Sequence, residues 1–123
     1  MRYMLLVVGN ADLVAAAKAE DLRALMGAFM AYTRAMQEAG VYVAGDPLKP
    51  PHTATTVRMK DGKAQVLDGP YAESREQLGG WFLIEAPDKG AALDWAARCP
   101  GVRYGAVEVR EIELIPGHND QAG

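Results

Sequence analysis

The sequence has one cysteine, no run of basic residues and no long apolar stretch, and each absence excludes a class of protein. With Cys99 as the lone cysteine, an internal disulfide is excluded. The 13 Lys and Arg residues are scattered and the formal net charge is -3, which argues against a nucleic-acid partner because phosphate binding needs a basic face. The apolar run from Tyr3 to Val8 is too short for a signal peptide or a membrane span. We therefore expect a soluble cytoplasmic protein without a membrane partner.

The usual marks of a cofactor or metal site are also missing. The sequence has no Gly-rich phosphate loop, no Gly-x-Ser-x-Gly and no Cys-x-x-Cys. Asp46, His52, Asp68 and Glu73 belong to metal-binding residue types, but their spacing is not diagnostic of a metal centre. Cys99 lies late in an Ala-rich helical pattern and is interpreted as a small buried hydrophobe rather than a reactive thiol. The sequence thus predicts neither a metal nor a cofactor.

The length fits one domain, which we place at residues 1–116, with residues 117–123 as a flexible C-terminal tail. Strands are predicted at Tyr3–Val8, Val41–Ala44, Trp81–Ile84 and Tyr104–Ile115, a hairpin at Thr53–Leu67, and a helix from Asp88 to Ala97. The strands Tyr3–Val8 and Trp81–Ile84 lack polar alternation, which predicts that both of their faces are buried. The last strand changes phase near Arg110, which predicts a bulge.

The longest predicted element is a helix from Glu20 to Ala39. Acidic residues at its start suit the positive end of the helix dipole, and Gly40 is a natural stop. At helical spacing, its apolar face consists of Leu22, Leu25, Met26, Phe29, Thr33 and Met36. Met26, Met30 and Met36 are interpreted as core residues.

The hairpin has a two-residue turn at Asp61-Gly62, which favours type I′ geometry. Its register then places Met59 opposite Ala64 and Val57 opposite Val66, so that one face is apolar. Without the hairpin the order is β-α-β-β-α-β, which predicts a ferredoxin-like α+β fold. Two helices cover only one face of such a sheet, so its second apolar face predicts a homodimer in which another copy covers it.

The segment from Asp68 to Gln77 supports two interpretations. In the structural one, Asp68 accepts backbone N–H bonds in a turn, and Ser74 to Gln77 is the capping box of a short helical turn. In the functional one, Asp68, Tyr71 and Glu73 line a cleft, because they precede a central strand. Both interpretations stay open on the sequence alone.

Two further residues have a functional and a structural interpretation. His52 could act as a base because its ordinary pKa lies near neutral pH, and Asp46 could orient it. The structural alternatives are an exposed loop histidine and a turn aspartate. The cleft is expected between residues 68–73, the strand end at Ala44–Asp46 and the main helix, where Phe29 makes one wall apolar.

The segment from Asp68 to Ile84 resembles the signature of the DGPF branch of the YCII-related family, whose usual form has Phe where this chain has Tyr71. Further matching pieces are Met1–Leu6, Thr53–Arg58, Trp95–Pro100 and Gly105–Arg110. These pieces are spread along nearly the whole chain, from Met1 to Arg110. The resemblance implies a dimeric α/β-barrel of two ferredoxin-like sheets, with a cleft in each subunit.

The resemblance implies less about activity. Some relatives carry a His–Asp pair in the cleft, and the YCII fold includes a dehydrochlorinase that acts on a chlorinated hydroquinone. By spacing back from Gly40, the family's helical His position falls about at Phe29, which cannot shuttle protons. DGPF-type domains also occur with extracytoplasmic-function sigma factors, which implies a regulatory link.

Two functional classes therefore remain. The favoured one is a dimeric small-molecule-binding or regulatory module, with ligand contacts from Asp68, Tyr71, Glu73 and Phe29. The alternative is a cofactor-free enzyme with acid–base chemistry, of the lyase or isomerase type, on a small aromatic or hydroxy acid. Its catalytic candidates are Asp68, His52 and Asp46.

Overall fold

A computed structural model describes residues 1–120 of the chain, and residues 121–123 lie outside the described part. In chain order the elements are β1 (Arg2–Asn10), α1 (Ala11–Ala16), α2 (Ala19–Glu38), β2 (Tyr42–Pro47), the 3₁₀ helix η1 (Pro51–Thr53), β3 (Thr55–Lys60), β4 (Lys63–Asp68), β5 (Glu76–Glu85), α3 (Lys89–Arg98), the 3₁₀ helix η2 (Pro100–Tyr104) and β6 (Gly105–Glu111). The predicted order of strands and main helices is confirmed.

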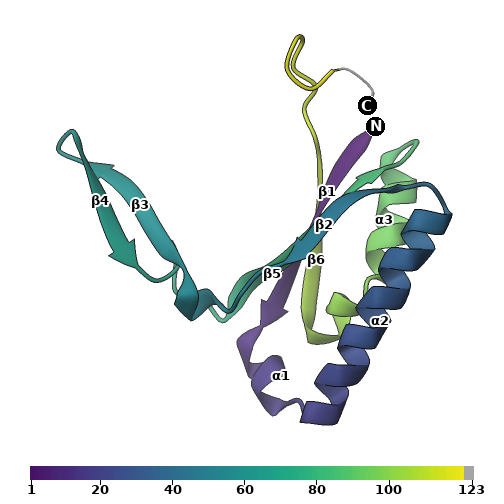
Figure 1. Cartoon of the computed structure of the whole chain (residues 1–123), viewed down its shortest axis with the longest axis horizontal. Helices are drawn as coiled ribbons and strands as arrows, with labels where there is room; N and C mark the ends of the chain where they lie inside the picture. The colour runs from purple at the N-terminus through teal and green to yellow at the C-terminus, as the bar shows by residue number, and fades with distance from the viewer. Residues whose placement is uncertain (121–123) are drawn as a thin grey trace.

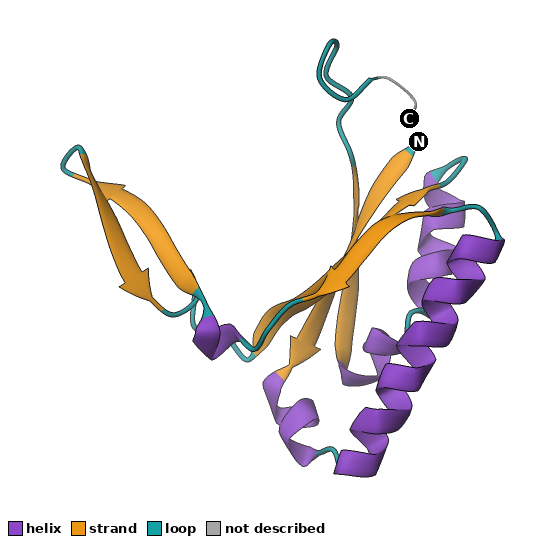
Figure 2. Ribbon diagram, in the orientation of Figure 1, coloured by secondary structure: helices purple, strands orange, loops and turns teal. Residues whose placement is uncertain are grey.

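The main sheet has the strand order β2-β5-β1-β6, and all neighbouring strands are antiparallel. This is the predicted ferredoxin-like arrangement, with β3 and β4 as a separate two-stranded sheet inserted between β2 and β5. Figure 2 shows α2 and α3 on one side of the main sheet, while β3 and β4 stand away from it on the other side. The described helices therefore cover only one face of the main sheet.

The core lies between the main sheet and the helices. The buried apolar side chains are Tyr3, Leu5, Tyr32, Met36, Phe82, Ile84, Ala86, Ala92, Ala96 and Cys99. Tyr3 pairs with Ile84 and Leu5 with Phe82, so alternate residues of β1 and β5 point toward the helices. Burial raises the pKa of the Cys99 thiol, in agreement with its predicted place as a buried hydrophobe.

Helix α2 agrees with the predicted main helix to within one residue at each end. The prediction that Met26 and Met30 belong to the core is wrong, because their side chains are 68% and 62% exposed. Each follows a residue that is partly buried, Leu25 or Phe29, and an α-helix turns by about 100° per residue. Of the three helical methionines only Met36 is buried.

The hairpin of β3 and β4, called the arm from here on (residues 55–68), has the predicted register. Met59 pairs with Ala64, and Val57 pairs with Val66. The turn residues Asp61 and Gly62 have φ angles of 52° and 77°, which is the left-handed conformation that a type I′ turn requires. In Figure 1 the arm projects away from the main sheet and its helices.

The predicted helical turn at Ser74–Gln77 is wrong, because β5 already begins at Glu76. The Gln77 side chain instead donates to the main-chain oxygens of Ala72 and Ser74, at 2.9 and 3.0 Å. The preceding bend is thus held by a side chain that reaches backward. Gly79 and Gly80, which follow this segment, also lie inside β5.

The bulge predicted near Arg110 is also wrong. Strand β6 pairs with β1 in an unbroken register from Gly105 to Glu111 and then ends. It ends there because β1 begins at Arg2, so Glu113 and Leu114 lie beyond the last pairing partner. Asn119 then orders a turn: its side chain accepts from the Ile115 N–H and donates to the Glu113 oxygen. The predicted flexible tail falls partly on this turn and partly on residues 121–123, outside the described residues.

No helix within residues 1–120 combines the length and the apolar character needed to cross a membrane.

Candidate functional site

A tight turn closes the base of the arm. The Gly69 N–H donates to the Ala54 oxygen at 2.7 Å, and the Thr56 hydroxyl donates to the Gly69 oxygen at 2.8 Å. Gly69 has a φ of 104°, which L side chains rarely adopt, so glycine fits this position. The Asp68 carboxylate, expected to accept turn N–H bonds, forms no hydrogen bond with any described residue, and that structural expectation is wrong. Backbone groups and Thr56 hold the turn instead.

Tyr71 lies just after this turn and is 81% exposed. The Arg58 guanidinium carbon lies 5.9 Å from the centre of the Tyr71 ring, within range of a cation–π contact. Arg58 belongs to the face of the arm opposite Val57, because residues alternate along a strand. Tyr71 therefore contacts the polar face of the arm and does not cover the apolar face.

The segment after Tyr71 is tied to α1 by an exposed ion pair. One guanidinium nitrogen of Arg75 donates to both carboxylate oxygens of Asp12, at 2.7 and 2.5 Å. The main-chain oxygen of Arg75 also accepts from the Ala11 N–H at 2.7 Å. Glu73, two residues before Arg75, is exposed. Residues 72–77 thus connect the arm to the N-terminal end of the helical layer.

Phe29 lies elsewhere, in the layer between α2 and the main sheet. Its ring stacks on Phe82 with centroids 6.3 Å apart and an interplanar angle of 18°. Phe82 in turn touches the end of β2, since a Cβ added at Gly45 would lie 2.6 Å from its ring. An aromatic contact therefore joins α2 to the strand end that was expected to border the cleft.

In a single protomer the predicted site residues do not gather around one cavity. Phe29 is half-buried on the side of α2 that faces the main sheet. In contrast, Asp68, Tyr71 and Glu73 are exposed near the base of the arm. His52 is exposed in η1, and Asp46 is exposed on β2, where it pairs with Trp81. No group of three or more candidate metal ligands forms within residues 1–120.

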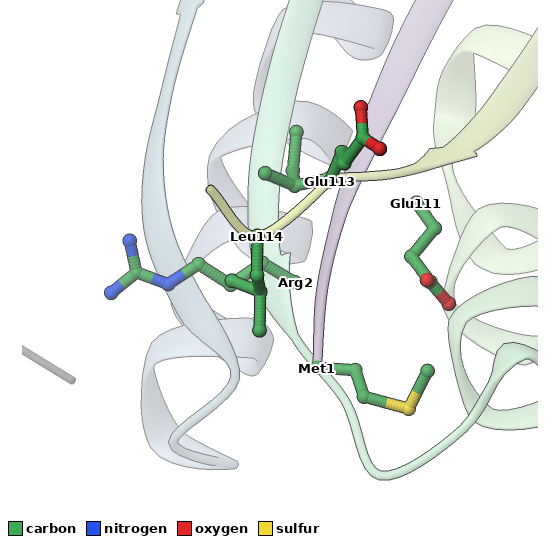
Figure 3. A pocket seen from close by; sticks show the side chains of 6 residues that line it. Met1, Arg2, Glu111, Glu113 and Leu114 are labelled. Carbon is green, nitrogen blue, oxygen red and sulfur yellow. The ribbon is translucent and has the colours of Figure 1, made fainter. Parts of the chain in front are cut away.

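One hollow that sequence reasoning missed lies at the N-terminal end of β1, with a cavity volume of about 450 Å³. It is lined by Met1, Arg2, Glu111, Ile112, Glu113 and Leu114. Figure 3 shows Met1 and Glu111 on one side of β1 and Arg2 on the other. No local motif in the sequence indicates this hollow, because it forms where the chain continues beyond the last residue of β6 that pairs with β1.

The two positive charges at this hollow, the N-terminal ammonium and Arg2, are paired with Glu85. The N-terminal ammonium lies 2.8 Å from one oxygen of Glu85, and the Arg2 Nε lies 3.4 Å from the other. The hydrogen bond from the ammonium holds the pKa of Glu85 below its usual value. Burial, followed by the nearby Glu111 carboxylate, raises the pKa of Tyr3. We interpret these ion pairs as contacts that stabilise the end of the sheet, and not as part of a ligand site.

A second hollow, of about 490 Å³, lies at the tip of the arm between Lys60 and Gln65. It is a wide surface depression that includes the side chains of Lys60 and Lys63. Neither hollow contains any of the residues predicted for the site.

A further apolar surface is the side of the main sheet that the helices leave uncovered. We call it the open face; its apolar residues are Met4, Leu6, Val8, Leu78, Trp81 and Leu83. They alternate with the core residues of β1 and β5, and Leu6 pairs directly with Trp81. Asp46 beside Trp81 and Glu108 beside Leu6 give this apolar stripe a charged border.

Comparisons with known proteins place the chain in a family. Residues 1–115 match the family described as the YCII-related domain. An uncharacterized protein of Rhizobium meliloti (strain 1021) is 33% identical over 120 residues, which cover 95% of this chain and 97% of that relative.

A solved structure with a similar fold is the 5-chloro-2-hydroxyhydroquinone dehydrochlorinase from Burkholderia phenoliruptrix AC1100, in complex with 2,5-dihydroxybenzoquinone. It aligns with a TM-score of 0.51 and 13% identity over 92% of this chain and 94% of that chain. At this identity the likeness shows the fold alone. The family match along residues 1–115 and the relative of nearly equal length establish that the chain belongs to the YCII-related family.

Proposed function

We propose that this protein is a homodimeric module that binds a small molecule with an apolar portion. The observation that carries the proposal is the Phe29–Phe82 stack. It occupies the layer between α2 and the sheet, and no charged side chain is buried anywhere among the described residues. An acid–base enzyme holds its proton-transfer groups where water is partly excluded, so an aromatic layer favours binding over catalysis.

The homodimer is supported by the open face. Its apolar residues form a continuous stripe over β1 and β5, and monomeric proteins rarely leave such stripes in water. A second copy that offers the same stripe would form a symmetric interface, with Leu6 and Trp81 near the centre and the charged border outside.

The ligand site is proposed near the base of the arm, with Asp68, Tyr71 and Glu73 as the polar contacts and Phe29 as the apolar wall. These groups lie apart in one protomer. The proposed site therefore forms only if dimerisation fixes the arm in a position that brings them together. The exposed ring of Tyr71 beside Arg58 suits a ligand that is aromatic or carries an acid group.

A regulatory role fits the same module. The Asp68-Gly69-Pro70 turn supports placement in the DGPF branch, and the resemblance of that branch supports a link to a sigma factor. The single buried cysteine supports a cytoplasmic location, where thiols stay reduced.

A thermal-shift screen against small carboxylic acids and phenols tests the binding proposal. A ligand present at 100 times its Kd adds about 2.7 kcal/mol to the free energy of unfolding, which raises Tm by several degrees. Asp68→Asn should remove the shift without changing the Tm of the free protein, whereas Asp94→Asn, an exposed change on α3, should keep it. The absence of any shift throughout such a library would contradict the proposal.

The second candidate is a cofactor-free enzyme of the lyase or isomerase type, with Asp68, His52 and Asp46 as its catalytic groups. It is favoured by the activity of the structural neighbour, a dehydrochlorinase of a hydroxylated aromatic. Incubation of the protein with chlorinated hydroquinones and small hydroxy acids, followed by product analysis, distinguishes the two candidates. Turnover that is lost in His52→Gln would establish the enzyme, and tight binding without turnover would establish the module.

A further inference from the structure

The arm has one apolar face that its own chain leaves uncovered. This face consists of Val57, Met59, Ala64 and Val66, with Val57, Met59 and Val66 exposed by 64%, 68% and 65%. The opposite face is mainly polar: it contains Arg58, Lys60, Lys63 and Gln65 beside one apolar residue, Leu67. The alternation gives the arm one surface suited to water and one suited to a protein contact.

The arm receives little support from the rest of the described chain. Neither of its strands forms an extensive contact with another described helix or strand. Figure 1 shows it joined to the main sheet only at its base. An isolated two-stranded hairpin is marginally stable in water and gains stability when its apolar face packs against another surface. The four apolar residues therefore indicate a partner that is missing from the single chain.

We propose that the apolar face of each arm docks on a second copy of this chain. The proposal rests on the homodimer proposed above and adds the arm to its interface. The position of the arm supports it: Figure 2 shows the arm on the side of the main sheet opposite the helices, which is also the side of the open face. A copy that covers the open face therefore lies beside the arm.

The length of the arm suits this contact. Each of its strands has six residues, which span about 20 Å at the usual rise of a β-strand. Two sheets packed face to face lie about 10 Å apart. The arm is thus long enough to pass the plane of the partner's sheet and to contact its flank. The arm also enlarges the apolar surface on that side toward the ~800 Å² per partner typical of stable interfaces.

Symmetry makes the contact reciprocal. In a two-fold dimer each copy both offers an arm and receives one, so the apolar faces of both arms are covered at once. The mainly polar face stays in water, where Arg58 accompanies Tyr71. Residues 69–73 follow the arm directly, so the docked arm carries Asp68 and Tyr71 to the boundary between the two copies. The docked position of Asp68 and Tyr71 at this boundary is the one that the proposed ligand site requires.

Sedimentation equilibrium of the full chain tests the contact. The paired change Val57→Lys with Val66→Lys places two charges on the apolar face and should weaken dimerisation at least about tenfold. The matched control, Gln65→Lys with Leu67→Lys, places the same charges on the opposite face of the arm and should leave the dimer Kd within about threefold. Circular dichroism should show that both variants keep the main fold.

A shortened chain gives an independent measurement. The Gly69 N–H bonds to the Ala54 oxygen, so two glycines can join these residues in place of the arm. This chain should keep its fold and lose dimer affinity like the lysine pair on the apolar face. If the parent is a dimer and both arm variants dimerise as tightly as it does, docking of the arm is overturned and the homodimer stands. If the parent itself is monomeric at high micromolar concentration, both proposals are overturned.

Discussion

The Tyr32 hydroxyl donates a hydrogen bond of 2.7 Å to the main-chain oxygen of Trp95, which joins α2 to α3 across the core. The same ring meets Phe82 edge-on, with centroids 5.4 Å apart. Both helices and the central strand β5 therefore meet at one side chain. Burial raises the pKa of Tyr32 far above its ordinary value, because the phenolate would lose its hydration.

Tyr32→Phe should lower the free energy of unfolding by about 1–3 kcal/mol, because the Trp95 oxygen loses its partner inside the protein. Urea denaturation followed by fluorescence measures the change. Tyr71→Phe is the matched control, since the Tyr71 ring is exposed and should show no more than a few tenths of a kcal/mol. Equal effects of both changes would contradict the role assigned to Tyr32.

Stability should fall as the pH rises above about 9 to 10. Cys99 and Tyr32 both have a raised pKa in the folded protein, so the folded state keeps protons that the unfolded chain has released. The stabilisation is complete below the unfolded pKa values and is lost as the pH rises through the folded ones. Denaturant midpoints measured from pH 8 to pH 11 check this, and Tyr32→Phe should flatten the slope above about pH 10.

Gly105→Ala should be among the most damaging glycine changes. A Cβ at this position would lie 1.9 Å from the main-chain oxygen of Val8, and backbone cannot move aside as a flexible side chain can. We expect a loss of about 3 kcal/mol or more, or failure to fold. Gly27→Ala, where a Cβ meets nothing within 4 Å, should stabilise α2 by about 0.5–1 kcal/mol. Thermal melts of the two variants should therefore move in opposite directions.

Asp68→Ala should change the free energy of unfolding by less than about 0.5 kcal/mol, because its carboxylate has no hydrogen-bond partner among the described residues. Gly69→Ala should cost about 1–2 kcal/mol, since its φ of 104° strains an alanine. A large loss in Asp68→Ala would show that the carboxylate supports the turn. A stable Asp68→Ala variant that fails to bind ligand would support the proposed site.

Leu6→Asp should convert the protein to a monomer. Leu6 lies at the middle of the open face beside Trp81, and a charge there would be buried without a partner in the dimer. Light scattering at micromolar concentration measures the mass. Leu13→Asp, a change of an exposed leucine on α1, should leave the parent mass unchanged. Identical masses for Leu6→Asp and the parent would exclude the open face from the interface.

Local sequence signals predicted most of the fold. Asp61-Gly62 specified both the turn and the strand register, because a type I′ turn leaves only one pairing that places Val57 opposite Val66. The start and stop residues of α2 bounded it within one residue. Predictions failed where tertiary context decides. Met26 lies on the predicted apolar face and Met30 follows Phe29 of that face, but the sheet covers too narrow a part of the helix to bury them.

The candidate site was harder to predict than the fold. Asp68, Tyr71 and Glu73 are close in sequence and exposed, whereas Phe29 is partly buried against Phe82. The turn-forming residues Asp68-Gly69-Pro70 predict the backbone conformation, but they do not predict where the neighbouring side chains point. The end of β6 depended on where β1 begins, which is a relationship between residues more than a hundred positions apart.

The hydrogen bond between Gly69 and Ala54 makes the arm a detachable segment, because its two ends meet outside the main sheet. Residues 55–68 form a sheet separate from the four main strands, so insertions or substitutions there should leave the pairing of the main strands untouched. Related proteins in one cell could therefore keep a common scaffold and diverge in this segment alone. Under the docking proposed above, such divergence would decide which chains recognise each other and keep similar subunits from mixing.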